Sequence, residues 1–258
     1  MAEKITLSGS IAGAQVAATS VHRIPVDVTL EASPEDGMLS GIPHEHYLSV
    51  GIGALTAIQS FARMWGVEAF GSIMDFGCGH GRVLRWLRAA YPLAAVVGAD
   101  IDADGVAFCA RTFGAEPLAS RVDFGAMQPP RNFDLIFAGS VITHLSEDQG
   151  RLLLEKFISW LNPGGIAVLS SHGNIRVARV LQGVITYGLA DNVTGALSGY
   201  FERGYGYADF PASRGYGTSF IKPDWFSRFA AQYPGRLEYA IVERGWDNHH
   251  DMIGFRRP

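Results

Sequence analysis

The residues with the clearest chemical meaning lie in one segment, residues 72–82, which reads SIMDFGCGHGR. An apolar strand pattern runs into alternate glycines at Gly77, Gly79 and Gly81, and a helical pattern follows. Glycines lack Cβ, so the turn and the N–H groups at the helix start can approach a bound molecule closely. A dinucleotide-binding turn spaces its glycines as G-x-G-x-x-G and stays clear for a pyrophosphate, whereas Asp75 stands two residues before the first glycine here. The segment predicts a ligand turn in which Asp75 faces a cationic group, although Asp75 could instead cap the turn.

A second acid ends the next apolar run, residues 94–100, which reads AAVVGAD. This acid, Asp100, comes about twenty residues after the glycine turn, where a doubly wound α/β fold places the residue that binds a ribose. Asp100 is therefore the ribose candidate. The competing interpretation is a solvated acid at a strand end.

These two segments resemble motif I and the following acidic strand end of class I S-adenosylmethionine-dependent methyltransferases. Residues 132–145 resemble the fourth strand of that family and the segment after it, and residues 161–165 resemble the turn before the fifth strand. The resemblance covers residues 45–172 well and the rest of the chain by topology. It implies an α/β fold: a doubly wound, Rossmann-like, mostly parallel seven-stranded sheet with an antiparallel last strand and helices on both faces.

The resemblance also implies a cofactor, S-adenosylmethionine, and the residues that bind it. Asp75 would meet the methionine end, Asp100 the ribose, and Ile101 would flank the adenine. The other expected cofactor contacts are Phe76, Gly77, Cys78, Gly79, Met127, Gly139, Ser140 and Tyr47. Many relatives carry an acid after the third strand that accepts a hydrogen bond from the adenine amino group, whereas residues 125–128 read GAMQ here. Adenine recognition is therefore expected from backbone atoms or from Met127.

Two histidines are candidates for removing a proton from the methyl acceptor. His144 follows the fourth strand, and His172 ends the fifth. Histidine titrates near neutral pH and can act as a general base, although either ring could simply pack beside the sulfonium.

No catalytic metal is expected. His249 and His250 invite a metal interpretation, but neighbouring residues of a strand face opposite sides and cannot easily bind one ion together. A catechol-type magnesium site needs carboxylates after the fourth and fifth strands, and neither Ser140 nor residues 172–174 supply one.

Strand and helix patterns alternate along the chain as a parallel doubly wound sheet requires. The expected elements are strand 72–76, helix 81–90, strand 95–100, helix 103–113, a weak strand 118–124, strand 133–139, helix 147–161, strand 165–171, helix 223–233, and a closing hairpin of 236–243 and 251–255 with its turn at 245–248. We therefore expect one methyltransferase domain over residues 65–258.

Two segments lie outside that plan. Residues 1–64 predict an N-terminal extension, with an extended or hairpin piece at 6–30 and a cofactor-covering helix at 52–64. Residues 173–221 form an insertion whose aromatic residues alternate with glycines over 199–217. This composition favours a substrate lid.

Composition narrows the setting and the partners. The 258 residues include 48% hydrophobic residues, enough for one large core. Two cysteines favour a reducing, cytoplasmic location over a disulfide framework, and residues 1–20 do not read as a signal peptide. No apolar run is long enough to span a membrane, so no membrane partner is expected. A net charge of −4 without a Lys/Arg cluster disfavours nucleic acid as a partner, and the Pro-Pro-Tyr and Pro-Cys signatures of base methylation are absent.

The expected function is a methyltransferase that acts on a small molecule or sugar. The methyl group is expected to go to an oxygen atom. The alternative is a non-catalytic protein that binds S-adenosylmethionine or S-adenosylhomocysteine on the same fold, because fold alone does not determine function. A nicotinamide dehydrogenase does not fit the glycine spacing, and the chain lacks a Tyr-x-x-x-Lys pair.

Overall fold

The computed structural model describes residue 25 and residues 27–258. Residues 1–20, where a signal peptide was not expected, lie outside the described residues, as does most of the expected extended piece at 6–30. The described residues 27–30 are in neither a helix nor a strand.

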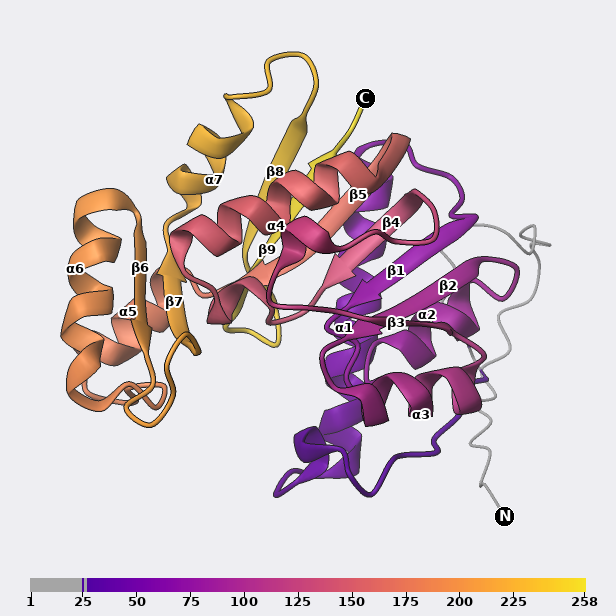
Figure 1. The fold of residues 1–258 in the computed structure, drawn as a ribbon, viewed down its shortest axis with the longest axis horizontal. Helices are drawn as coiled ribbons and strands as arrows, with labels where there is room; N and C mark the ends of the chain where they lie inside the picture. The colour runs from indigo at the N-terminus through magenta and orange to yellow at the C-terminus, as the bar shows by residue number, and fades with distance from the viewer. Residues whose placement is uncertain (1–24, 26) are drawn as a thin grey trace, which may run out of the picture.

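Seven strands form one sheet in the order β3-β2-β1-β4-β5-β9-β8 (Figure 1). Their bounds are β1 Ser72–Phe76, β2 Ala95–Asp100, β3 Glu116–Ala119, β4 Phe133–Ala138, β5 Leu161–Ser171, β8 Glu238–Trp246 and β9 His250–Arg256. β1 to β5 run parallel, whereas β9 is antiparallel to both β5 and β8. The expected fold class is confirmed.

Helices cover both faces of this sheet. Their bounds are α1 His44–Met64, α2 Leu84–Ala90, α3 Ala103–Phe113, α4 Glu147–Trp160 and α7 Pro223–Ala230. Successive strand residues point to opposite faces, so Ile73 packs with α1, α2 and α3, whereas Met74 packs with α4 and α7. The carboxyl ends of the parallel strands remain available for a ligand.

The leading helix differs from the expectation. It begins at His44, not at residue 52, because Gly51 lies inside the helix and serves helix packing. A Cβ atom on Gly51 would lie 2.4 Å from Nε1 of Trp86 and 2.4 Å from the carbonyl oxygen of Arg82. The glycine that looked like a helix boundary therefore allows close contact between α1 and the segment that enters α2.

Other element boundaries also shift, each for a local reason. α2 begins at Leu84 rather than at residue 81, because the turn continues through Gly81, whose φ is +83°. The weak strand lies at Glu116–Ala119, and Phe124–Ala126 form a short 3-10 helix, η2, capped by the Asp123 side chain. The closing hairpin turns at residues 247–249, because Trp246 pairs with His250 and still belongs to β8.

Residues 173–221 form a small module at one end of the sheet, on the left in Figure 1. It contains α5 Asn174–Leu181, the 3-10 helix η4 Ala190–Asn192, α6 Val193–Arg203 and an antiparallel pair, β6 Tyr205–Asp209 and β7 Gly217–Ile221. The module has its own apolar cluster, which includes Val177, Tyr200 and Phe220. The segment is therefore built of regular elements with packed side chains.

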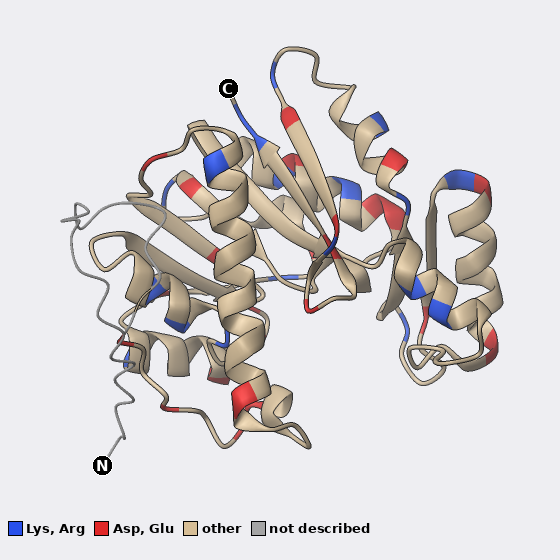
Figure 2. Cartoon of the chain, turned by 180° about the vertical axis from the view of Figure 1, so that it is seen from behind, with Lys and Arg blue, Asp and Glu red and all other residues tan. Residues whose placement is uncertain are grey.

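Basic and acidic residues are interspersed over the helices and loops visible in Figure 2. Within the described part of the chain, the helices are too short or too polar to cross a bilayer.

Candidate functional site

The glycine turn after β1 is held against β2. The N–H groups of Gly77 and Cys78 both donate to the carbonyl oxygen of Ala99, at 2.7 and 3.1 Å. A Cβ on Gly77 would lie 2.5 Å from the Val141 side chain, and one on Gly81 would lie 2.4 Å from the Phe113 ring. These two glycines are therefore required by the protein's own packing. This differs from the expectation that all three glycines make room for a ligand.

Gly79 is the glycine that faces open space. Its φ is +48°, and a Cβ built there would meet no atom within 4 Å. The missing side chain leaves room beside the backbone of the turn, as a bound ligand would require. The open space at the turn therefore lies beside Gly79.

Asp75 lies at the end of β1 with 2% of its surface exposed. Its Oδ2 atom has no hydrogen-bond partner among the described residues. Burial, together with the nearby Asp100 carboxylate, raises the pKa of Asp75 to about 8. A buried carboxylate oxygen without a partner is costly to leave unsatisfied, so this position suits a cationic group of a ligand.

Asp100 is half-buried at the end of β2 and holds the turn from the other side. Its Oδ2 accepts from the Gly79 N–H at 2.7 Å, and its Oδ1 accepts from the Asp102 N–H at 2.9 Å. A carboxylate oxygen accepts more than one hydrogen bond, so Asp100 can bind ribose hydroxyls while it orders the turn. The next residue, Ile101, is 69% exposed, and its side chain is free to cover an adenine ring.

Three other expected cofactor contacts have buried side chains. Phe76 and Met127 pack in the core cluster beneath α4, and Cys78 packs in the cluster on the opposite face. Cofactor contacts from these residues stay a prediction, and they would come mainly from backbone atoms.

Tyr47 lies behind the cavity, with no exposed surface. Its hydroxyl donates to Oδ2 of Asp36 at 2.7 Å and accepts from Arg85 at 3.4 Å. The Arg82 guanidinium lies 5.9 Å from the centroid of the Tyr47 ring. Tyr47 therefore supports Arg82, and a direct cofactor contact from Tyr47 stays a prediction.

Arg82 reaches the cavity and was not among the residues expected from the sequence. Burial lowers its pKa, while Tyr47, Asp36, Asp247 and Asp75 act in the opposite direction. The sequence feature that could have identified Arg82 is its position directly after Gly81, the last glycine of the turn.

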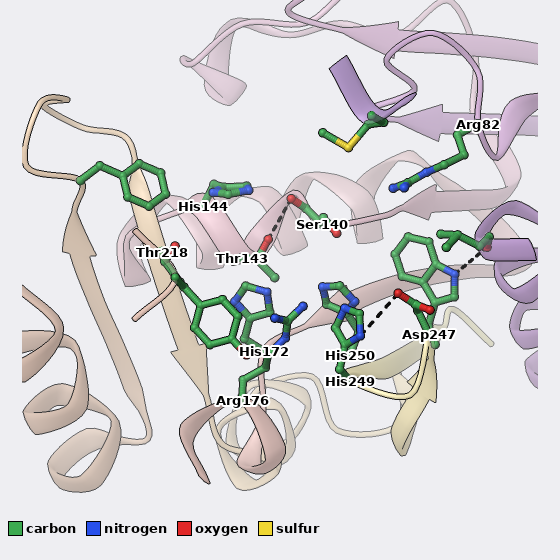
Figure 3. Close-up of a pocket in the computed structure, with 15 residues that line it drawn as sticks. Arg82, Ser140, Thr143, His144, His172, Arg176, Thr218, Asp247, His249 and His250 are labelled. Atoms are coloured by element: carbon green, nitrogen blue, oxygen red, sulfur yellow. Dashed lines mark hydrogen bonds and ion pairs between the residues drawn. The ribbon is translucent and has the colours of Figure 1, made fainter. Parts of the chain in front are cut away.

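A cavity of about 330 Å³ lies at the carboxyl ends of the strands (Figure 3). At the end of β4, a Cβ on Gly139 would lie 2.9 Å from Trp246. Ser140 follows with a φ of +59°, and its N–H donates to Oγ of Ser170 at 2.7 Å. The indole N–H of Trp246 donates to the Val50 carbonyl at 2.8 Å, which joins the closing hairpin to α1. Packing thus allows Ser140 to line the cavity next to the glycine turn.

His144 and His172 line the same cavity, and strand β7 orients both rings. Nδ1 of His144 lies 2.8 Å from the Gly217 carbonyl oxygen, and Nδ1 of His172 lies 3.2 Å from that of Ser219. A carbonyl only accepts, so both rings carry their proton on Nδ1 and keep a lone pair on Nε2. Burial lowers the pKa of both histidines, so the neutral form predominates at pH 7.

His249 and His250 also line this cavity, together with Arg176 and Tyr187. The expectation that the two adjacent histidines face opposite sides was wrong, because His249 lies in the turn and β9 begins at His250. Their ring centroids lie 4.4 Å apart, and the His250 ring stacks on His172 at 5.1 Å. In the described ranges, no three His, Cys, Asp or Glu side chains are grouped to bind a metal.

Comparison with known proteins agrees with this geometry. Residues 74–167 match a family model described as a methyltransferase domain. Trans-aconitate 2-methyltransferase from Rhizobium meliloti is 32% identical over 105 residues, covering 41% of this chain and 40% of that protein. Phosphoethanolamine N-methyltransferase 1 from Arabidopsis thaliana is 25% identical over 130 residues, covering 48% of this chain and 25% of that protein. The chain thus spans two fifths or less of these relatives.

Solved structures share the fold across most of the chain. An amino pentose methyltransferase from Micromonospora echinaspora bound to S-adenosylmethionine has a TM-score of 0.55 and 15% identity, covering 81% of this chain and 92% of that one. An S-adenosylmethionine-dependent methyltransferase from Clostridium acetobutylicum has a TM-score of 0.54 and 12% identity, covering 86% of this chain and 95% of that one. The matched segment runs from Met74 in β1 to Ala167 in β5, so this part of the chain is a methyltransferase domain, and the chain shares the fold of S-adenosylmethionine-dependent methyltransferases.

Proposed function

We propose that this domain transfers a methyl group from S-adenosylmethionine to an oxygen atom of a small molecule or sugar. The observation that carries the proposal is the continuity of the site. Arg82 and Ser140 adjoin the glycine turn, and both line the same cavity as His144 and His172.

The residues at the turn fit the cofactor. The unpartnered Oδ2 of Asp75 would accept from the ammonium group, and Arg82 would pair with the carboxylate of the methionine moiety. The open space at Gly79 would admit the cofactor close to the backbone, and Asp100 would bind the ribose hydroxyls. When bound, the cofactor supplies a sulfonium-activated methyl group, and its positive charge disappears on transfer.

The chain's own task is to align the acceptor, exclude water and remove one proton. Alignment of the reacting groups lowers the barrier most, and a positioned base contributes roughly 10²- to 10⁴-fold. Nε2 of His144 is the proposed base, because Gly217 holds the Nδ1 proton and leaves Nε2 with its lone pair. His172 is the second candidate, held in the same way by Ser219. A neutral histidine can remove the proton of a hydroxyl group as that oxygen is methylated.

Residues 173–221 are proposed as the substrate lid. Tyr187, Phe210 and Thr218 of this segment line the cavity. The Tyr216 ring also stacks on His144, with centroids 5.0 Å apart. The segment therefore borders the space where the acceptor and the base would meet.

The relatives' names support a small acceptor. Trans-aconitate and phosphoethanolamine are small molecules, and the Micromonospora protein is named for an amino pentose. These acceptors differ from one another, so they support the size class and leave the acceptor of this chain to experiment.

The test combines binding with turnover on the full chain. Calorimetry measures S-adenosylhomocysteine binding, and mass spectrometry detects the gain of one CH₂ unit after incubation with S-adenosylmethionine and a set of hydroxylated metabolites. Replacement of the base, His144→Gln or His172→Gln, should lower kcat by about a hundredfold and leave S-adenosylhomocysteine affinity unchanged. His46→Gln, an exposed histidine of α1 outside the cavity lining, is the control.

The two measurements test different parts of the proposal: the role of each histidine and the transfer reaction itself. A variant that loses S-adenosylhomocysteine binding has its histidine in the cofactor wall instead of acting as the base. Tight binding without transfer to any acceptor would favour a non-catalytic binding protein.

A further inference from the structure

Two arginines reach the cavity from different elements. Arg82 follows the glycine turn, and Arg176 lies on α5, with its guanidinium beside His172 (Figure 3). The proposed function uses Arg82 for the carboxylate of the cofactor. Arg176 therefore remains as a cation that cofactor binding leaves without a partner.

Arg176 lacks a counter-ion in the described part of the chain. No carboxylate lies within ion-pair distance of its guanidinium, and its Nε atom is buried without a hydrogen-bond partner. Its Cζ atom lies 4.4 Å from the centroid of the Tyr187 ring. A cation–π contact of this kind holds the guanidinium in place while its N–H groups remain available.

Two further polar atoms of the lining are buried without partners among the described residues. They are Nδ1 of His250 and the hydroxyl of Tyr187, which makes no hydrogen bond of normal geometry but lies near enough to the Arg176 guanidinium to oppose the lowering of the guanidinium pKa by burial. The His250 ring stacks on His172, which in turn stacks on Tyr187 at 5.6 Å. Because buried polar groups are almost always hydrogen-bonded in folded proteins, three such groups on the walls of one cavity indicate a polar ligand.

The charges of the lining residues indicate whether that ligand is an anion or a cation. Among the described lining residues, Asp247 alone carries a carboxylate. It is exposed, and its Oδ2 lies 3.5 Å from Nδ1 of His249. The lining otherwise offers two guanidinium groups and four imidazoles. Guanidinium N–H groups match the oxygens of a carboxylate or phosphate, and Tyr and His can add single donors.

We propose that Arg176, Tyr187 and His250 bind an oxyanion carried by the methyl acceptor, a carboxylate or a phosphate. This inference rests on the proposed function, since it names the chemical class of the acceptor. The anion anchors the acceptor at the α5 wall and leaves its hydroxyl free to reach the histidine base.

A purely structural role for Arg176 is the competing explanation. The contact with Tyr187 alone would serve to fix the loop after α5 to the helix. That role accounts for the ring contact, but it leaves Nε of Arg176 and Nδ1 of His250 unsatisfied. The two roles differ in a measurable way, because only the anion site responds to added oxyanions.

The experiment titrates the full chain, saturated with S-adenosylhomocysteine, with three probes: inorganic phosphate, malonate and neutral glycerol. Calorimetry and NMR of the histidine rings report binding. Phosphate or malonate should bind and shift the His172 and His250 resonances, whereas glycerol should do neither. Comparison of phosphate with malonate distinguishes a phosphate from a carboxylate acceptor.

Arg176→Gln should weaken binding of the preferred anion by about tenfold or more, the usual effect of losing a charge-assisted hydrogen bond. Arg179→Gln removes the same charge from the same helix outside the cavity lining, and it should stay within about twofold of the parent. Once an acceptor is known, Arg176→Gln should raise KM far more than it lowers kcat.

The proposal is overturned if Arg176→Gln binds the preferred anion as tightly as the parent does. It is also overturned if the parent binds glycerol as tightly as it binds phosphate and malonate. If Arg176→Gln fails to fold, the parent's NMR titration decides, since unmoved His172 and His250 resonances equally overturn it. Failure of the proposed function looks different: the parent would not bind S-adenosylhomocysteine at all, whatever the anions do.

Discussion

The unusual group at the residue scale is the carboxylate of Asp75, which is buried with one oxygen that has no hydrogen-bond partner among the described residues. With a pKa of about 8, Asp75 is mostly protonated at pH 7 in the free protein. Burial is the main cause and Asp100 the second, and an arriving cation would act against both by favouring the ionised carboxylate. The state of Asp75 therefore reports whether the cofactor's ammonium group lies where we propose.

Cofactor binding should release close to one proton at pH 7. The ammonium group favours ionised Asp75, and the displaced proton enters the buffer. Calorimetry with S-adenosylhomocysteine in buffers of different ionisation enthalpy measures this number directly. At pH 9 the release should vanish, because Asp75 is then ionised before binding, and Asp75→Asn should release none at either pH. Proton release by the variant equal to that of the parent would remove Asp75 from the site.

A second prediction at this scale concerns the contribution of Asp100 to cofactor affinity. Asp100→Asn should weaken S-adenosylhomocysteine binding by about tenfold or more, because the charge-assisted bonds to the ribose are lost. The variant retains the side-chain shape and one oxygen for the Gly79 N–H. Asp104→Asn, an exposed acid in the first turn of α3, is the matched control and should bind as the parent does. Parent-like affinity of Asp100→Asn in a folded protein would show that the ribose lies elsewhere.

At the scale of elements, strand β7 joins the inserted module to the segments that follow the carboxyl ends of β4 and β5. The N–H of Ile221 donates to the His172 carbonyl at 2.8 Å, and Oγ of Ser219 donates to the Ile142 carbonyl at 2.9 Å. Tyr205 of β6 packs in the main core on Trp225, with centroids 5.0 Å apart. β7 and Tyr205 are therefore fixed parts of the wall, and the hairpin loop at 211–216 is the part of the proposed lid that places Tyr216 on the face of His144.

Replacing residues 211–216 by a short Gly/Ser linker should separate binding from turnover. The replacement removes Tyr216 from the face of His144 but leaves β7 and every proposed cofactor contact. S-adenosylhomocysteine should bind with parent-like affinity, while kcat/KM for an identified acceptor should fall about tenfold or more.

The longer replacement, residues 199–216, serves as the contrast. It also removes Tyr205 and strand β6, so it should lower the unfolding temperature by several degrees or more. Full activity of the shorter variant would contradict the assignment of this loop to a lid.

For the molecule as a whole, Asp75 links stability to pH. Its folded-state pKa of about 8 is raised from 3.8, so its stabilising contribution is complete below pH 4 and disappears as the pH rises toward 8. The free energy of unfolding of the free protein should therefore fall over this range relative to Asp75→Asn. Urea unfolding at pH 5 and pH 8 measures the effect, which should be on the order of a few kcal/mol.

The other titrating groups contribute equally to the pH dependence of both proteins, so the comparison removes their effect. These groups include Asp251, whose pKa is raised to about 6 mainly by burial. Equal pH dependence of the two proteins would mean that Asp75 is already ionised in the free protein at neutral pH.

The sequence by itself determined the sheet, the glycine turn and the two acids that flank it. These features follow from local rules: strand and helix periodicity set the alternating elements, and glycine spacing sets the turn. The bounds of β1, β2 and α3 agree with the expectation to the residue. Local rules failed at Gly51 because its close neighbours, Arg82 and Trp86, come from a distant part of the chain, and at His249 because this residue lies in the hairpin turn and not in a strand.

The tertiary structure alone decided how the cavity is completed. The tautomers of His144 and His172 depend on carbonyls of β7, which lies far along the chain from both. Arg176, Tyr187 and His250 come from a helix, a loop and the closing hairpin, and no periodic pattern relates them. Side chains brought together only by packing leave no local signal in the sequence, so the orientation of the two histidines and the charge of the cavity wall become visible only in the folded chain.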